Sequence, residues 1–227
     1  TLGAIVLLGT RAHAEIVRFY PIYNPAWDRM MTFVREKTPE NAIVTSWWSP
    51  GHFLTSMGQR RVTFDGSSQN EPQAYWVANV FIQNSERAAL GILRMLNTSG
   101  NASVEYLQKR GFTLSDAVDL IQTLVPLSRR DARAKLLRRF SEAEADGLLD
   151  LTHGRTAPPP AYLFTYNHMI EQVLALEFIG RWNFKRAEAF GSYANQQPDE
   201  VDRRLLARAT PQNTRLLWAM TEQPTFT

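Results

Sequence analysis

Apolar residues recur at helical spacing through most of this 227-residue chain, and only three short β-favouring runs interrupt the pattern. The first helix is predicted to follow Asn24, a suitable N-cap, with Pro25 at its first position and its end near Thr38. Further helices are predicted from residue 72 onward, from residue 85, and over 103–108, 115–124, 128–140, 143–149, 167–179 and 198–208. The three strands are predicted at 42–46, 61–65 and 161–165. A few short strands packed among six or more helices indicate a single helix-dominated α+β domain.

The composition narrows the classes of function. Hydrophobic residues make up 44% of the chain and charged residues 21%, so a hydrophobic core is expected and extensive disorder is not. The absence of cysteine excludes a disulfide framework, a thiolate metal site and a cysteine nucleophile. The 25 basic residues are nearly all arginine, whereas phosphate-binding proteins use both arginine and lysine. Nucleic acid is therefore not an expected partner.

The chain opens with a short apolar run, TLGAIVLLG, over residues 1–9. This run has about half the length that a membrane span needs, and no basic region precedes it as in a signal peptide. Residues 1–23 are therefore predicted to be the stub of a removed membrane region. A buried first strand or helix is an equally good explanation of the same run.

Two adjacent tryptophans, Trp47 and Trp48, lie in a predicted turn directly after the first expected strand. One indole of such a pair ordinarily has to face water, which is unusual for so large an apolar ring. A recognition surface would use the indole N–H donors and the flat apolar faces to bind a ligand's hydroxyl and methyl groups. The structural alternative is that one ring packs into the core and the other covers a loop.

The segment around the two tryptophans resembles a motif of the oligosaccharyltransferase catalytic subunit. Residues 38–53, TPENAIVTSWWSPGHF, are similar to the family's pattern nTPedA-v-sWWDyGy. Residues 24–38, 61–71 and the helix from residue 85 resemble the elements that flank this motif in the family. Residues 158–180 resemble a strand and helix that carry a second, Met-x-x-Ile motif in bacterial members. The resemblance covers 24–110 and 158–184, and residues 111–157 do not align.

The resemblance implies that residues 24–227 form the water-facing C-terminal, acceptor-recognition domain of a membrane glycosyltransferase. In the family, the double-tryptophan motif binds the Ser or Thr of an Asn-x-Ser/Thr acceptor, and the second motif packs on the threonine methyl. The implied acceptor-binding residues here are Trp47, Trp48, Ser49, Met169, Gln172 and Leu176.

Two of these positions depart from the family pattern. Ser49 stands where the family has Asp, and Gln172 stands where it has Ile. A serine hydroxyl can accept a hydrogen bond but carries no charge, and hydrogen bonds to charged groups are the stronger ones. Recognition of a hydroxyl-bearing acceptor is therefore expected to be weaker, or the site is remodelled for a different acceptor. The joint change at Ser49 and Gln172 favours the remodelled site.

The resemblance places the bond-forming chemistry outside this chain. Catalytic carboxylates and a divalent metal, Mn²⁺ or Mg²⁺, are implied on a membrane portion upstream of residue 1, so no catalytic or metal-binding residue is expected here and the chain alone is expected to be inactive. The implied partners are an acceptor polypeptide, a lipid-linked oligosaccharide and the cell membrane, with this domain on its periplasmic or extracytoplasmic side. His52, His153 and His168 are expected to be ordinary hydrogen-bonded residues, and Asp65 is expected to cap a turn.

Other hypotheses rest on other segments. A non-catalytic extracytoplasmic peptide-binding module would use the tryptophan pair without any transfer. The arginine-rich stretch 128–140 is predicted to be a solvated helix face, or alternatively a contact for lipid headgroups or a lipid pyrophosphate. Two Asn-x-Ser sequences, at residues 97–99 and 101–103, are potential glycosylation acceptors in the chain itself.

Overall fold

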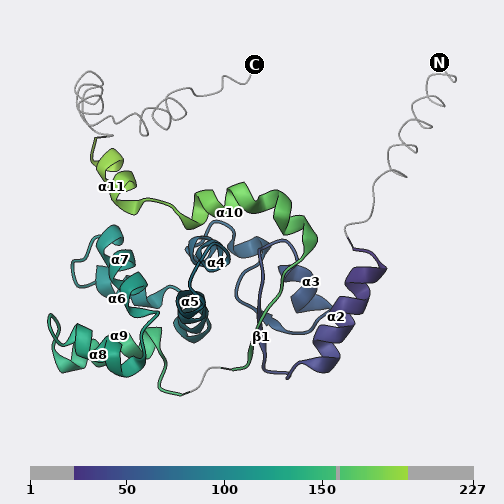
Figure 1. Cartoon of the computed structure of the whole chain (residues 1–227), viewed down its shortest axis with the longest axis horizontal. Helices are drawn as coiled ribbons and strands as arrows, with labels where there is room; N and C mark the ends of the chain where they lie inside the picture. Colours follow the sequence, from purple (N-terminus) through teal and green to yellow (C-terminus); the bar gives the residue numbers. More distant parts are fainter. Residues whose placement is uncertain (1–22, 157–158, 194–227) are drawn as a thin grey trace, which may run out of the picture.

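Three short parallel strands form the centre of the molecule, where β1 (Ile43–Thr45) lies between β2 (Arg61–Val62) and β3 (Ala161–Leu163). Ile43 pairs with Arg61 on one side and with Ala161 on the other. The computed structural model describes residues 23–156 and 159–193 (Figure 1). Ten α-helices and two 3₁₀ helices surround the sheet in this part of the chain, so the predicted helix-dominated α+β fold is confirmed.

The helices have the following bounds. They are α2 (Pro25–Lys37), α3 (Gly51–Ser56), α4 (Gln73–Phe81), α5 (Glu86–Ser99), α6 (Ala102–Gln108), α7 (Leu114–Leu124), α8 (Arg129–Leu136), α9 (Glu142–Thr152), α10 (Val173–Gly180) and α11 (Phe184–Tyr193), with the 3₁₀ helices η1 (Gly66–Ser68) and η2 (Asn167–Gln172).

Helices cover the sheet from two sides. Val44 of β1 packs with Val34 of α2 and Leu54 of α3 in a small cluster, whereas Trp47, three residues further on, belongs to a larger cluster. That larger cluster is built mainly from α4 to α9, which lie on the other side of β1 in Figure 1. Successive side chains of an extended segment point to opposite faces, and this alternation lets one short run serve both clusters.

Local sequence explains where several helices begin. The side chains of Asn24, Ser85 and Ser128 each accept a hydrogen bond from a backbone N–H group in the first turn of α2, α5 and α8, respectively. These interactions satisfy donors that a helix start leaves unpaired. The predicted starts of α2 and α5 are therefore confirmed with their caps.

The structure differs from the sequence-based expectation in four places. Helix α3 begins at Gly51, the last residue of the turn predicted over 47–51, and continues over residues for which no element was predicted. The expected helix over 167–179 begins as the 3₁₀ helix η2, and the helix expected over 128–140 ends at Leu136. Helix α11 was not predicted at all. The helix expected over 198–208 and nearly all of the expected N-terminal stub lie outside the described residues.

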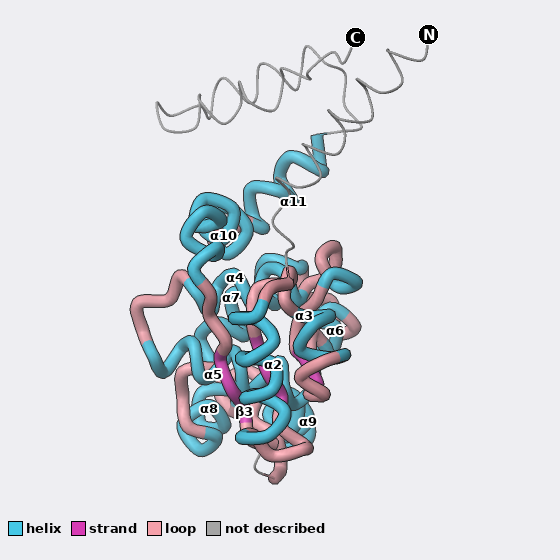
Figure 2. The backbone as a smooth tube through the Cα atoms, turned by 90° about the vertical axis from the view of Figure 1, so that its right-hand side faces the viewer, coloured by secondary structure: helices cyan, strands magenta, loops and turns pink. Residues whose placement is uncertain are grey.

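Helix α10 packs closely on α4, next to the end of the sheet at which the strands finish. Gly180 makes this approach possible, because a Cβ atom there would lie 2.9 Å from the backbone of Asn79. The Asn79 side chain also donates a hydrogen bond of 2.7 Å to the Gly180 carbonyl. Figure 2 shows α10 and α11 at one end of the molecule and α8 and α9 toward the other.

Within the described residues, we find no helix with the length and apolar character that a membrane crossing requires.

Candidate functional site

The carboxyl ends of the three strands meet at one edge of the sheet, because the strands are parallel. Trp47, Trp48 and Ser49 follow β1 at this edge, Asp65 follows β2, and Tyr166 follows β3. Open α/β sheets bind ligands most often at this edge, since loops of different strands converge there. Figure 1 shows β3 rising toward α10, so the edge lies next to the start of that helix.

A side-chain hydrogen bond joins two of these loops across 117 residues of sequence. The Ser49 hydroxyl and the Tyr166 hydroxyl bond to each other, and either group can be the donor. Ser49 belongs to the double-tryptophan segment, and Tyr166 directly precedes η2, the start of the second motif. The two segments that resemble acceptor motifs are therefore in direct contact.

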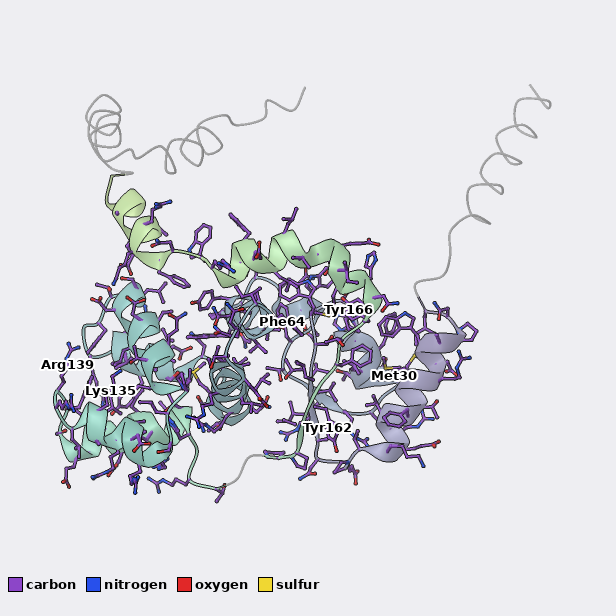
Figure 3. The ribbon with its side chains drawn as sticks, viewed as in Figure 1. Met30, Phe64, Lys135, Arg139, Tyr162 and Tyr166 are labelled. Carbon is purple, nitrogen blue, oxygen red and sulfur yellow. The ribbon has the colours of Figure 1, made fainter. Side chains whose placement is uncertain are left out.

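The Tyr166 ring is held by other aromatic rings. It lies 5.5 Å from the ring of Trp27 and 6.1 Å from the ring of Phe164, measured between centroids. Burial raises the pKa of the Tyr166 phenol, which therefore keeps its proton at neutral pH. Figure 3 shows Tyr166 where β3 runs toward α10, on the side of the sheet that faces α2.

The two indoles have different environments. Trp47 is only 3% exposed and packs against the ring of Phe64 at a centroid distance of 5.2 Å. Trp48 is half-buried and covers the same cluster from outside. Trp47 therefore supports the loop from the core, and the exposed part of the pair belongs to Trp48.

The second motif is likewise split between core and surface. Met169 and Leu176 are buried in the same cluster as Trp47. Gln172 is half-buried, and its side-chain oxygen is buried without a hydrogen-bond partner among the described residues. Several apolar side chains of this segment are exposed, among them Ile170 and Val173, which are not motif positions, and also Leu174 and Phe178. The exposure of Ile170 and Val173 follows from helical spacing, one residue beyond Met169 and Gln172.

Asp65 and His52 form the rim of the same edge on the β2 side. The Asp65 carboxylate caps η1 by accepting from the backbone N–H of Ser67, so its predicted turn-capping role is confirmed. Hydrogen bonding from Ser67 lowers the pKa of this carboxyl group. His52 is exposed, and its Nδ1 lies 3.9 Å from the Asp65 carboxylate. This pair shapes the rim, and it does not contact the Ser49–Tyr166 pair through any hydrogen bond in the described part of the chain.

The other two histidines lie in ordinary surroundings. His153 is buried at the end of α9, with its ring nitrogens 2.8 Å from the Thr152 hydroxyl and 3.1 Å from the Leu127 carbonyl. Burial lowers the pKa of His153 to about 4, so the ring is neutral. His168 is exposed and lies 3.0 Å from the Glu171 carboxylate.

The arginine-rich stretch is partly structural. Arg129 donates to the Asp150 carboxylate at 2.7 Å and to the Gly154 carbonyl at 2.6 Å, and Arg133 donates to Asp146 at 2.8 Å. These contacts fasten α8 to α9. Four basic side chains remain exposed on this helix and the turn after it, namely Arg130, Lys135, Arg138 and Arg139. Figure 3 shows Lys135 and Arg139 at the periphery, away from the carboxyl edge.

The two internal Asn-x-Ser sequences are also engaged in the fold. Asn97 accepts from the Thr63 hydroxyl at 2.9 Å, and Asn101 accepts from the Trp76 indole at 3.0 Å. Ser103 is fully buried. The sequence at 101–103 is therefore not accessible as an acceptor in the folded chain.

The part of the chain that the structure describes contains no group of three or more His, Asp or Glu side chains that could hold a metal ion.

Comparison with known proteins identifies relatives over most of the chain. It is 38% identical over 179 residues to the dolichyl-phosphooligosaccharide-protein glycotransferase of Methanococcus voltae, covering 75% of this chain and 19% of that protein. It is 36% identical over 174 residues to the protein of the same name from Methanocaldococcus jannaschii, covering 72% of this chain and 18% of the relative. The dolichyl-phosphooligosaccharide-protein glycotransferase 2 of Pyrococcus furiosus is 30% identical over 93 residues, or 40% of this chain and 12% of the relative. No protein-family model and no solved structure matches the chain.

The chain has a helix-dominated α+β fold in which the two motif-bearing segments meet at the carboxyl edge of a small parallel sheet. By its sequence, the chain belongs to the family of the dolichyl-phosphooligosaccharide-protein glycotransferases, the oligosaccharyltransferase catalytic subunits. It spans about a fifth of the length of these two methanogen relatives. The match extends beyond 24–110 and 158–184, so the family relationship also includes part of the sequence that the motifs left unaligned.

Proposed function

We propose that this chain is the acceptor-recognition domain of a membrane glycosyltransferase that moves an oligosaccharide from a lipid carrier to protein. The relatives' name describes a dolichyl-linked oligosaccharide and a protein acceptor. The observation that carries the proposal is the Ser49–Tyr166 hydrogen bond, because it joins the two acceptor-like segments at the carboxyl edge of the sheet.

In this proposal the site residues have two roles. Trp48, Ser49 and Gln172 keep part of their surface accessible and contact the acceptor. Trp47, Met169 and Leu176 are buried in one cluster and hold the two loops in position. The exposed side chains of Ile170 and Val173 supply apolar surface beside them, which suits the methyl group of a threonine.

The rest of the longer protein supplies the donor site and the transfer chemistry. In this proposal the divalent metal, Mn²⁺ or Mg²⁺, and its carboxylates also lie in that part of the protein, as the resemblance implies. The cell membrane and its outer, extracytoplasmic side are the location that this proposal requires. The 227-residue chain alone is expected to transfer no sugar.

Binding of an Asn-x-Thr peptide to the full chain tests the proposal. Trp48→Ala should weaken binding about tenfold, because it removes an aromatic contact surface at the site. Trp182→Ala is the matched control, since Trp182 is an exposed indole beyond the far end of α10. Equal affinity in the wild type and in both variants would exclude the carboxyl edge as the acceptor site.

A further inference from the structure

We infer that Tyr166 is a specificity-determining residue that recognises a hydroxyl group on the acceptor side chain together with Ser49. This inference rests on the proposed function and names the chemistry of its site. Neither sequence motif contains Tyr166, and it was not singled out by the sequence. Its role follows from the hydrogen bond between the two hydroxyls at the carboxyl edge.

The surroundings of Tyr166 fix the position of its hydroxyl. Its ring contacts Trp27 and Phe164, and these two rings also contact each other at 5.7 Å. Phe164 is 6% exposed and packs in the small cluster between the sheet and α2. A ring held on these sides loses little rotamer freedom when a ligand binds, which favours precise recognition at low entropic cost.

Two neutral hydroxyls suit a third hydroxyl as their ligand. Each hydroxyl donates one hydrogen bond and accepts others, so an acceptor Ser or Thr can donate to one member of the pair and accept from the other. The Tyr166 phenol keeps its proton because burial raises its pKa, and it therefore remains both donor and acceptor. A carboxylate at position 49 could only accept.

The same arrangement limits the selectivity of the site. When the acceptor side chain lacks a hydroxyl, Ser49 and Tyr166 still satisfy each other, and no buried charge is left unpaired. The discrimination then reflects only the hydrogen bonds gained from the ligand. We expect Asn-x-Thr to bind about three- to tenfold more tightly than Asn-x-Val, in which a methyl group replaces the hydroxyl.

Gln172 supplies a second polar group on the same segment. Its buried side-chain oxygen has no hydrogen-bond partner in the described residues, and such orphaned acceptors are rare in folded proteins. A bound peptide that donates an N–H or O–H group to this oxygen would satisfy it. Tyr166 and Gln172 therefore both offer neutral hydrogen-bonding groups, whereas the charged Glu171 of the same segment is exposed and pairs with His168.

Peptide affinities of the full chain test the role of Tyr166. Dissociation constants are measured by titration with two peptides that differ only by Thr or Val two residues after Asn. Tyr166→Phe and Ser49→Ala should each lower the Thr-over-Val ratio to about one, and the double variant should lower it no further, because the two hydroxyls act as one unit. Tyr162→Phe is the control, since Tyr162 is an exposed residue of β3 and should keep the wild-type ratio.

The outcomes separate the inference from the proposed function. If Tyr166→Phe and Ser49→Ala both keep the wild-type ratio of Thr-peptide to Val-peptide affinity, Tyr166 does not recognise the acceptor hydroxyl. The proposed acceptor site is not contradicted by that result. If the wild type binds neither peptide, the proposed function is wrong and the inference falls with it. Thermal unfolding of each variant shows that a changed ratio is not caused by loss of the fold.

Discussion

The neutral residue Ser49 is one of two positions at which the candidate site departs from the family pattern. The sequence favoured a site remodelled for another acceptor, because Gln172 departs from the pattern as well. In the structure, the Ser49 hydroxyl forms a hydrogen bond with the Tyr166 hydroxyl. In the proposed acceptor site this pairing favours retained but weaker hydroxyl recognition, and a site remodelled for another acceptor is the alternative.

The Ser49→Asp substitution tests this view. The Tyr166 hydroxyl would donate to the new carboxylate, and an acceptor hydroxyl would donate to it in a charge-assisted hydrogen bond. We expect the preference for Asn-x-Thr over Asn-x-Val to increase by about 1–2 kcal/mol, or about five- to thirtyfold. Peptide titration of the wild type and of the variant measures the change. Weaker binding of both peptides without a gain in preference would instead support a remodelled site.

The pH dependence of stability is predicted from His153. Its pKa is about 4 in the folded chain and near 6.5 in an unfolded chain, because the fold buries the neutral ring. The neutral ring therefore stabilises the fold fully above pH 6.5, and this contribution is lost as the pH falls toward 4. The wild type should lose on the order of 1–2 kcal/mol of unfolding free energy between pH 7 and pH 5.

His153→Gln is the comparison for this measurement, since it removes the titrating ring and keeps a polar side chain. Denaturant titrations at pH 5, 6 and 7 should give a flatter profile for the variant than for the wild type. Carboxyl groups with lowered pKa, such as Asp150, contribute mainly below pH 5. Parallel profiles for the two proteins would show that His153 does not carry the dependence.

At the scale of elements, the close approach of α5 to the end of α7 depends on one glycine. A Cβ atom at Gly91 would lie 2.0 Å from the Val125 carbonyl oxygen, which belongs to the backbone and cannot move aside easily. Gly91→Ala should therefore destabilise the fold by about 1–3 kcal/mol despite the higher helix propensity of alanine. Chemical denaturation measures this loss.

Gly147→Ala provides the matched control for Gly91→Ala. The new Cβ atom would lie 2.8 Å from the Tyr106 hydroxyl, which is the mobile end of a side chain. Gly147→Ala should therefore lose clearly less unfolding free energy than Gly91→Ala. An equal loss of unfolding free energy in the two variants would show that α5 and the end of α7 do not pack as closely as the structure describes.

Elements defined by local signals could be predicted, and those defined by distant contacts could not. The caps at Asn24 and Ser85 are local hydrogen bonds, so the sequence showed them directly. Helix α3 was missed because Pro50-Gly51 is typical of a turn. Gly51 instead allows close packing on Asp65, where a Cβ atom would lie 2.4 Å away.

The candidate site shows the same division. The double tryptophan was visible as a motif, but its separation into a buried and a half-buried ring depends on the packing of Phe64. The contact between Ser49 and Tyr166 depends on the parallel pairing of β1 with β3 across more than a hundred residues. No local pattern carries that information.

At the scale of the whole molecule, the proposed function places acceptor binding and sugar transfer in different parts of a longer protein. This chain matches about a fifth of its relatives' length, and its described residues contain no metal cluster. The proposal assigns acceptor binding to the carboxyl edge of the sheet and transfer chemistry to the remainder. The exposed basic residues of α8 lie at the far end of the molecule from α10, so they have no part in this site (Figure 1).

Photo-cross-linking of an acceptor peptide to the full chain tests whether the acceptor binds at the carboxyl edge of the sheet. The peptide carries Asn-x-Thr followed by a photoreactive residue, and mass spectrometry maps the attachment sites. We expect cross-links at residues 47–49 and 166–173. Excess Asn-x-Thr peptide should suppress these cross-links, and excess Asn-x-Val peptide should suppress them less. Competed cross-links confined to other surfaces, such as residues 128–140 on and after α8, would contradict it.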